Sequence, residues 1–212
     1  VCVLITATIW ASAIAVWLSV TLAVISMTLI IRSWIIRGDN GQTIGFCPDS
    51  LRIVKPLAIF LPAAVIVIVA IGYLINPEFY KRQNFVDKVY QQAMGPYLAW
   101  SVVQEGLLNG YFSNRVGQLV SAQGGSSSGG KNDRKSALIV GLFFAFLHLP
   151  NPVLTIGTFF WAGTSCYLFL KYSRNAYLLG FAHSILGTAI KFVIAAPLIG
   201  SGCMRVGPGF WR

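Results

Sequence analysis

The stretch that decides the fold of this chain is Trp100-Ser-Val-Val-Gln-Glu-Gly-Leu-Leu-Asn-Gly-Tyr-Phe112. It is mostly apolar, but its middle carries Gln104, Glu105 and Asn109. Glu105 is the only acidic residue within any apolar run of the chain. A carboxyl group at membrane depth is costly, so an ionisable residue there marks a functional site by default. The stretch therefore predicts a buried helix that carries a functional carboxyl group.

The rest of the chain is similarly apolar. Of its 212 residues, 56% are hydrophobic and only 10% are charged, whereas soluble domains carry roughly 25% charged residues. The mean hydropathy is +0.69. These values predict an integral membrane protein with a single domain over residues 1–212. The apolar run 1–31 lacks the basic start and cleavage site of a signal peptide, so we expect a retained span. Because the chain opens on Val1 rather than Met, we also expect sequence before it.

Six apolar runs are candidates for membrane spans, since a helix crosses a bilayer in about 20 residues. Prolines and glycines fix several of their ends, because helices stop at or just before proline. The sequence thus predicts an all-α, polytopic transmembrane bundle of about six spans, at 3–31, 56–75, 95–112, 137–150, 152–171 and 175–199.

Two connections between these runs have their own character. Residues 76–94 alternate charged and apolar residues at near-helical spacing, which is typical of an amphipathic helix on the membrane interface. Residues 121–136 are rich in Gly and Ser and predict a flexible loop.

The net charge of +10 is explained by the membrane rather than by nucleic acid. The basic residues are spread over the loops, and no basic stripe with interleaved aromatic residues occurs. Segments 32–55, 113–136 and 171–174 carry ten Lys or Arg, against five in 76–94 and 200–212. Cytoplasmic loops carry the excess of Lys and Arg. We therefore expect loops 32–55 and 113–136 in the cytoplasm, the N-terminus outside, and a bacterial-type inner (plasma) membrane as the location.

The polar residues of the opening stretch lie close together on the predicted helix. Glu105 lies about nine residues into that helix, roughly mid-membrane by helical rise. Asn109 follows one turn later on the same face, and Gln104 lies about 100° round the helix. A carboxyl group poised between desolvation and a nearby imidazole suits general-base work.

The chain's only two histidines also lie in apolar runs. His148 lies at the end of the fourth run. Taken alone, it would be explained as a helix-end residue whose ring bonds a backbone carbonyl. His183 shares a stripe at helical spacing with three small residues, and alone it would be explained as part of a seam between packed helices. These small residues are Ala176, Gly180 and Gly187.

Together, Glu105 and the two histidines predict one catalytic site. The carboxylate would activate a water molecule, and the imidazoles would stabilise the oxyanion and protonate a leaving amine. The chain has no HExxH motif, and its four cysteines show neither CxxC nor CxxxH spacing, so no metal and no cofactor is predicted. Zinc held by Glu105, His148 and His183 stays open as an alternative, because three such ligands from three helices would suffice.

The order of these motifs resembles the CPBP group, the CAAX prenyl endopeptidase and bacteriocin-processing (abortive-infection) family of intramembrane proteases. That family shows Glu-Glu-x-x-x-Arg, Phe-x-x-x-His and His-x-x-x-Asn on successive membrane helices. The resemblance covers residues 95–195, nearly half of the chain. The matching segments are Gln104-Glu105-Gly-Leu-Leu-Asn109, Phe144-Ala-Phe-Leu-His148 and His183-Ser-Ile-Leu-Gly187.

Three positions depart from the family pattern. Gln104 stands where the family has its first Glu, Asn109 stands for the Arg, and Gly187 stands for the Asn. The resemblance implies that Glu105, His148 and His183 are catalytic. Support for the substrate or the oxyanion would come from Gln104, Asn109, Asn151 and Gly187.

The predicted function is that of an intramembrane endopeptidase, which hydrolyses a peptide bond of a membrane-bound peptide or protein. Two other classes stay open. A catalytically inactive relative would bind or assemble without cutting, which the three departures favour. A proton-coupled transporter would use Glu105 and the histidines as a relay, but the internal repeats typical of transporters are not found in the sequence.

Overall fold

The computed structural model of this chain describes residues 4, 6–8, 16–47, 51–82, 84–124, 129–200, 203–207 and 210. Over this part of the chain the regular structure is helical, apart from an isolated bridge between Phe46 and Asn175. The predicted all-α class is confirmed.

Four helices of the described residues are long and apolar enough to cross a membrane. This supports a membrane protein, but the predicted total of about six spans is not confirmed. The four are α2 (Val16–Arg37), α4 (Val54–Ile75), α9 (Pro152–Lys171), and a continuous helix formed by α10 (Ala176–Ala189), η3 (Ile190–Ala195) and α11 (Ala196–Ile199).

The ends of these helices follow from the residues that break them. The helix α4 ends at Ile75, directly before Asn76-Pro77, and α9 begins at Pro152. Proline is well placed at the first position of a helix because it has no N–H to satisfy there. The Asn151 side chain caps α9 by accepting a hydrogen bond from the Leu154 N–H at 3.1 Å.

The other two predicted spans, 95–112 and 137–150, lie in more polar helices. The first belongs to a helix that runs through α6 (Pro96–Leu107), a π-helical turn η2 (Leu108–Ser113) and α7 (Asn114–Gly124). The second is the apolar half of α8 (Gly129–Leu147), whose first turns carry Lys131, Asp133, Arg134 and Lys135.

The prediction of a flexible loop over 121–136 is wrong for most of that segment. The helix α7 continues to Gly124 and α8 begins at Gly129, while 125–128 lie outside the described residues. Packing explains the difference: Asn132 and Ser136 are buried, and the Ser136 hydroxyl donates to the Asn132 carbonyl at 2.8 Å. Tertiary contacts have overridden the low helix propensity of Gly and Ser.

The amphipathic helix predicted within 76–94 is present as α5 (Phe85–Met94). A short turn, η1 (Phe79–Lys81), precedes it. One face of α5 exposes Val86, Tyr90 and Met94. A further short helix, α3 (Gly41–Ile44), follows α2.

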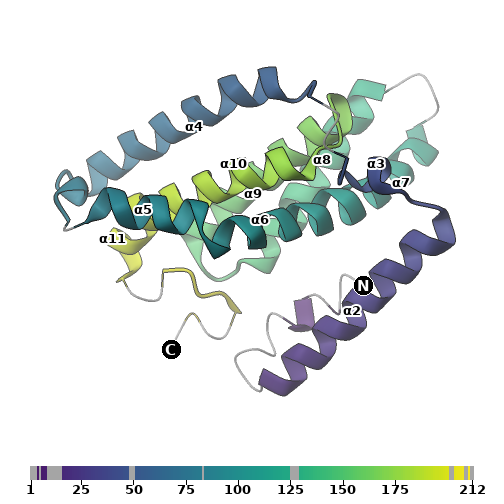
Figure 1. Cartoon of the computed structure of the whole chain (residues 1–212), viewed down its shortest axis with the longest axis horizontal. Helices are drawn as coiled ribbons and strands as arrows, with labels where there is room; N and C mark the ends of the chain where they lie inside the picture. The colour runs from purple at the N-terminus through teal and green to yellow at the C-terminus, as the bar shows by residue number, and fades with distance from the viewer. Residues whose placement is uncertain are drawn as a thin grey trace.

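The helix α10 runs through the middle of the bundle, where it contacts α4, α6 and α9 (Figure 1). Its small-residue stripe lets α6 approach closely, because a Cβ on Gly180 would stand 2.6 Å from the Val102 backbone. The helices α8 and α9 form an antiparallel hairpin through the turn at 148–151. The predicted seam along α10 is therefore present, and it faces the opening stretch.

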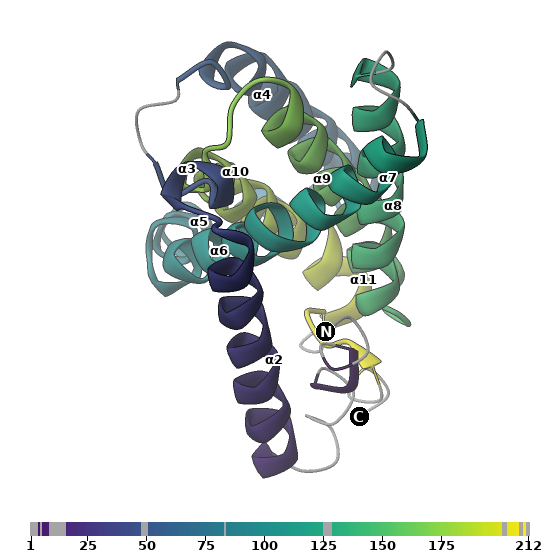
Figure 2. The ribbon, with the colours of Figure 1, turned by 90° about the vertical axis from the view of Figure 1, so that its right-hand side faces the viewer.

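The helix α2 projects from the rest of the bundle (Figure 2). It is attached near its C-terminal end, where the Trp34 indole donates to the Gly110 carbonyl at 3.3 Å. An ion pair between Arg115 and Asp39, both largely buried, adds to this attachment.

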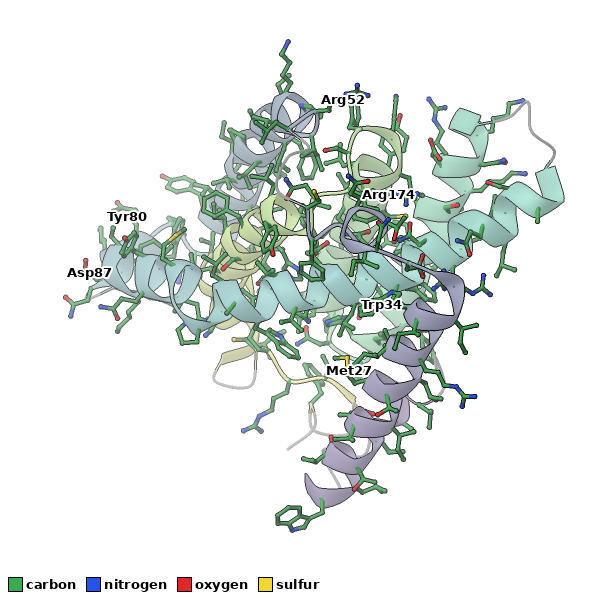
Figure 3. All side chains as sticks on the ribbon, turned by 45° about the vertical axis from the view of Figure 1, so that its right-hand side comes forward. Met27, Trp34, Arg52, Tyr80, Asp87 and Arg174 are labelled. Carbon is green, nitrogen blue, oxygen red and sulfur yellow. The ribbon has the colours of Figure 1, made fainter. Side chains whose placement is uncertain are left out.

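The two ends of the bundle carry different loops. Arg52, just before α4, and Arg174, just before α10, lie in the upper part of Figure 3, whereas Tyr80 and Asp87, which follow α4, lie at its left. The bridge between Phe46 and Asn175 joins the connection that precedes α4 to the start of α10.

Candidate functional site

Glu105 is the centre of the site. Its side chain is fully buried, and three N–H donors from three elements converge on its carboxylate. Oε1 accepts from Trp161 Nε1 of α9 at 2.7 Å and lies 2.8 Å from His183 Nδ1 of α10. Oε2 accepts from Asn109 Nδ2 at 2.5 Å. An ionised carboxylate satisfies this arrangement, because it accepts hydrogen bonds at both oxygens.

A second group of polar side chains holds Asn109 in place. Its Oδ1 accepts from the Ser113 hydroxyl at 2.9 Å, and its Nδ2 lies 3.3 Å from the Ser165 hydroxyl of α9. Glu105, Asn109 and Ser113 are four residues apart, so they form a ladder on one face of the helix. The carboxylate is therefore held at a fixed position between α6, α9 and α10.

His183 has one ring nitrogen fixed by Glu105. When its Nδ1–H donates to the carboxylate, the neutral ring carries its lone pair on Nε2. The ring lies between Trp161 and Tyr97, whose ring centroids are 5.8 and 6.2 Å away. Its orientation is thus set by a carboxylate and two aromatic walls.

His148 has its Nδ1 fixed in a different way. This nitrogen lies 2.7 Å from the Phe144 carbonyl, which only accepts, so Nδ1 carries the hydrogen. The neutral ring again has its lone pair on Nε2. The bond to a carbonyl at a helix end is the structural role expected of this residue alone, but the ring also lines the site cavity described next.

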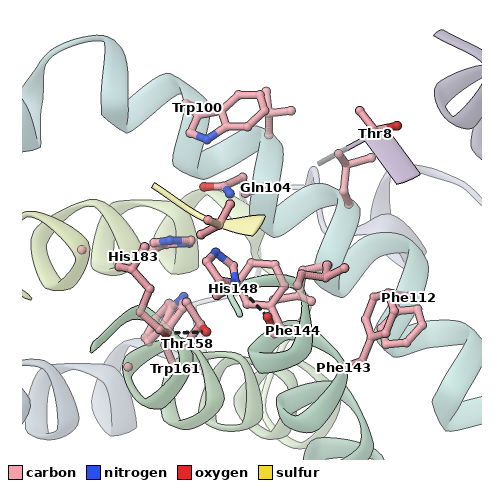
Figure 4. A pocket seen from close by; sticks show the side chains of 18 of the residues that line it. Thr8, Trp100, Gln104, Phe112, Phe143, Phe144, His148, Thr158, Trp161 and His183 are labelled. Atoms are coloured by element: carbon pink, nitrogen blue, oxygen red, sulfur yellow. Dashed lines mark hydrogen bonds between the residues drawn. The ribbon is translucent and has the colours of Figure 1, made fainter. Parts of the chain in front are cut away.

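A cavity of about 600 Å³ lies beside the two histidines. Gln104, His148 and His183 converge on it from α6, the end of α8 and α10 (Figure 4). No hydrogen bond reaches Nε2 of either ring from the described residues. The remaining wall is mostly apolar and aromatic, and includes Met27, Ile30, Phe112, Phe143, Phe144, Leu147, Trp161, Met204 and Val206.

Glu105 itself does not line this cavity. It lies behind His183 and Trp161, with both oxygens occupied by donors. Two of the residues that bond the Glu105 carboxylate, His183 and Trp161, do line the cavity.

The supporting residues expected from the sequence are divided by the structure. Gln104 and Gly187 line the cavity, and Asn109 supports Glu105. Asn151 does neither: besides capping α9, its Nδ2 donates to the carbonyls of Cys203 at 2.8 Å and Arg205 at 3.0 Å. Asn151 therefore ties the C-terminal segment to the α8–α9 turn, and through Met204 and Val206 that segment closes one side of the cavity.

Of the three residues considered as zinc ligands, Glu105 has both carboxylate oxygens within hydrogen-bond distance of nitrogen atoms. His183 directs Nδ1 at the carboxylate itself, and His148 directs Nδ1 at a backbone carbonyl. Among the described residues no group of three His, Cys, Asp or Glu side chains is placed to hold a metal ion.

Trp161 is the main residue that sequence reasoning missed. It lies in an apolar run, where a tryptophan is usually explained as core. The one available signal was its indole N–H, which needs a partner when the ring is buried.

No protein-family model, curated protein or solved structure matches this chain. Its function must therefore be inferred from the chemistry of the site.

Proposed function

We infer that this chain is a membrane-embedded hydrolase that cuts a peptide bond of a membrane-associated protein or peptide in this cavity. One observation carries the proposal. The buried Glu105 fixes Nδ1 of His183, which leaves Nε2 as a base beside a cavity that His148 and Gln104 also line.

The reaction begins with a water molecule between His183 and the scissile carbonyl. Nε2 of His183 takes a proton as the water oxygen attacks the carbonyl carbon, and Glu105 stabilises the imidazolium that forms. The Gln104 amide donates to the oxyanion. The imidazolium then returns the proton to the leaving nitrogen, and the C–N bond breaks. His148 orients the water through its own Nε2.

In this scheme Glu105 is a positioning residue and His183 is the base. The resemblance to the CPBP proteases implies a glutamate base instead, so the assignment differs from the family pattern. The meeting of the three motif segments at one cavity supports the resemblance itself. The excess of Lys and Arg in the connecting segments supports a cytoplasmic placement of loops 32–55 and 113–136, and we extend the proposal to an inner (plasma) membrane location.

A second candidate function is binding without cutting. It is favoured by the occupied oxygens of Glu105 and by the largely apolar wall of the cavity, which suits a hydrocarbon ligand. Purified protein that retains an apolar ligand but releases no fragments from membrane proteins would support this candidate.

The hydrolase is tested by comparing membranes from cells that express the wild type or His183→Asn. Asparagine keeps a donor for Glu105 but has no ring base. New protein N-termini, measured by mass spectrometry, should appear with the wild type and disappear with the variant. Tyr177→Phe, at a half-exposed position of α10, is the control and should retain them. If His183→Asn is folded and yields the same N-termini, the hydrolase proposal is refuted.

A further inference from the structure

A second, smaller pocket of about 390 Å³ shares the lining residue Tyr97 with the site cavity. It is formed by α5, the first turn of α6 and η3, and its wall combines the polar side chains of α5 with the rings of Pro96, Tyr97 and Phe192. Tyr97 is the one residue shared between the described linings of the two cavities. The pocket is lined by Lys88, Gln91, Gln92, Pro96, Tyr97 and Phe192.

Tyr97 lines this pocket and also contacts His183. Its ring meets the His183 ring edge-on, with centroids 6.2 Å apart and an interplanar angle of 88°. Its hydroxyl lies over Gly187, where an added Cβ would come within 2.3 Å of the oxygen. Only glycine at 187 leaves room for the phenol in this position. The Tyr97 side chain thus links the wall of the second pocket to the ring of His183.

The pattern of α5 indicates where this pocket opens. Lys88, Gln91 and Gln92 line the pocket, whereas the apolar Val86, Tyr90 and Met94 are exposed on the opposite face of the helix. A helix with this division lies in the membrane interface with its apolar face towards the acyl chains. The pocket then lies at headgroup level, within reach of water. A hydrogen bond of 3.1 Å between Lys191 Nζ and Gln92 Oε1 fixes α5 against η3 at the pocket.

Hydrolysis consumes one water molecule per bond, yet the wall of the site cavity is largely apolar and faces the region of α2. We propose that the pocket behind Tyr97 is the water inlet of the site, and that the Tyr97 ring is its gate. This inference rests on the proposed hydrolase function, but the gate itself is a property of the fold and can be measured without a substrate.

The test uses phosphoramidate, a charged reagent that phosphorylates histidine ring nitrogens, on the full chain in lipid nanodiscs. Its charge keeps it out of the acyl chains, so it reports only a polar route. Phosphorylation of His183 is followed by mass spectrometry. Tyr97→Ala should raise its rate at least about tenfold, since a minor open state is populated at no more than about a tenth. Tyr97→Phe keeps the ring and should match the wild type.

Tyr90→Ala, the same substitution on the opposite face of α5, is the matched control and should leave the rate unchanged. The gate is refuted if Tyr97→Ala does not raise the rate, or if Tyr90→Ala raises it equally. If Tyr97→Ala fails to fold, the pocket is blocked instead by a bulky maleimide on Gln91→Cys, with Val86→Cys as its control. Blocking should slow the labelling of His183, and an unchanged rate overturns the inlet.

The labelling experiment tests the water inlet and the cleavage experiment tests the hydrolase, so either proposal can be refuted without the other. Faster labelling in Tyr97→Ala together with unchanged N-termini in His183→Asn would leave the inlet in place and remove the hydrolase. Cleavage that requires His183, together with unchanged labelling in Tyr97→Ala, would do the reverse.

Discussion

Replacing Glu105 by glutamine is the most direct test of the site, because the change keeps the shape and removes one acceptor. The new amide nitrogen must stand at the position of Oε1 or Oε2. At Oε1 it would face the N–H groups of Trp161 and His183, and at Oε2 it would face the Asn109 amide. Every placement sets a donor against a donor in a fully buried position.

The expected loss of stability follows from this one unavoidable donor–donor contact. A buried donor left without its acceptor costs about 1–3 kcal/mol. Asn109 could avoid this cost only by turning its amide and losing its bond to Ser113, and His183 only by changing its tautomer. We therefore expect Glu105→Gln to lower the free energy of unfolding by about 2 kcal/mol, in the middle of that range. Activity should fall more steeply, on the order of a thousandfold, because His183 is then free to adopt the tautomer that has no base on Nε2.

The assay is reversible unfolding in detergent, with the same substitution at Glu78 as the control. Glu78 is exposed and forms a surface ion pair with Lys81, so Glu78→Gln should change the free energy of unfolding by less than about 0.5 kcal/mol. Nitrogen chemical shifts of His183 report the tautomer directly. An unfolding free energy for Glu105→Gln equal to that of the wild type, with an unchanged His183 tautomer, would refute the assigned network.

Three further predictions follow from single contacts. Trp161→Phe removes one donor from the Glu105 carboxylate and should cost about 1.5–3 kcal/mol of unfolding free energy, the range for hydrogen bonds to charged groups; a loss below 0.5 kcal/mol would contradict it. Asn151→Ala removes the cap of α9 and should cost about 0.5–2 kcal/mol, and limited proteolysis should cut the C-terminal segment faster than in the wild type. Gly180→Ala forces a Cβ against α6 and should cost about 1–3 kcal/mol by overpacking. Gly130→Ala, whose Cβ would meet nothing within 4 Å, should not destabilise, and equal effects of the two glycine changes would disprove the close approach.

Helix ends and helix class were predictable because they depend on local chemistry. Proline at 152 fixes where α9 begins, and Asn76-Pro77 fixes where α4 ends, whatever packs around them. The segment 121–136 was mispredicted because the burial of Asn132 and Ser136, which holds α8 in a helix there, depends on elements distant in the sequence.

The candidate site was predictable only in part, for a related reason. An acid and a histidine in apolar runs each need a partner, so Glu105 and His183 point to one another from the sequence alone. A tryptophan in an apolar run or an asparagine in a turn has several ordinary structural roles. Nothing local in the sequence therefore shows that Trp161 supports the carboxylate, or that Asn151 holds the C-terminal segment instead of a substrate. Such roles depend on which distant residues the fold brings into contact.

The convergence of three helices on one carboxylate has a consequence for how the chain matures. Synthesis delivers α6 before α9 and α10, so Glu105 exists for a time without Trp161 and His183. During that interval the bilayer holds an acid whose partners have not yet been made, a costly state that the arrival of α10 ends. Completion of the site and completion of the bundle are therefore one event. A chain truncated before Ala176 would keep Asn109 and Trp161 but lack His183, so the carboxylate would miss one of its three partners.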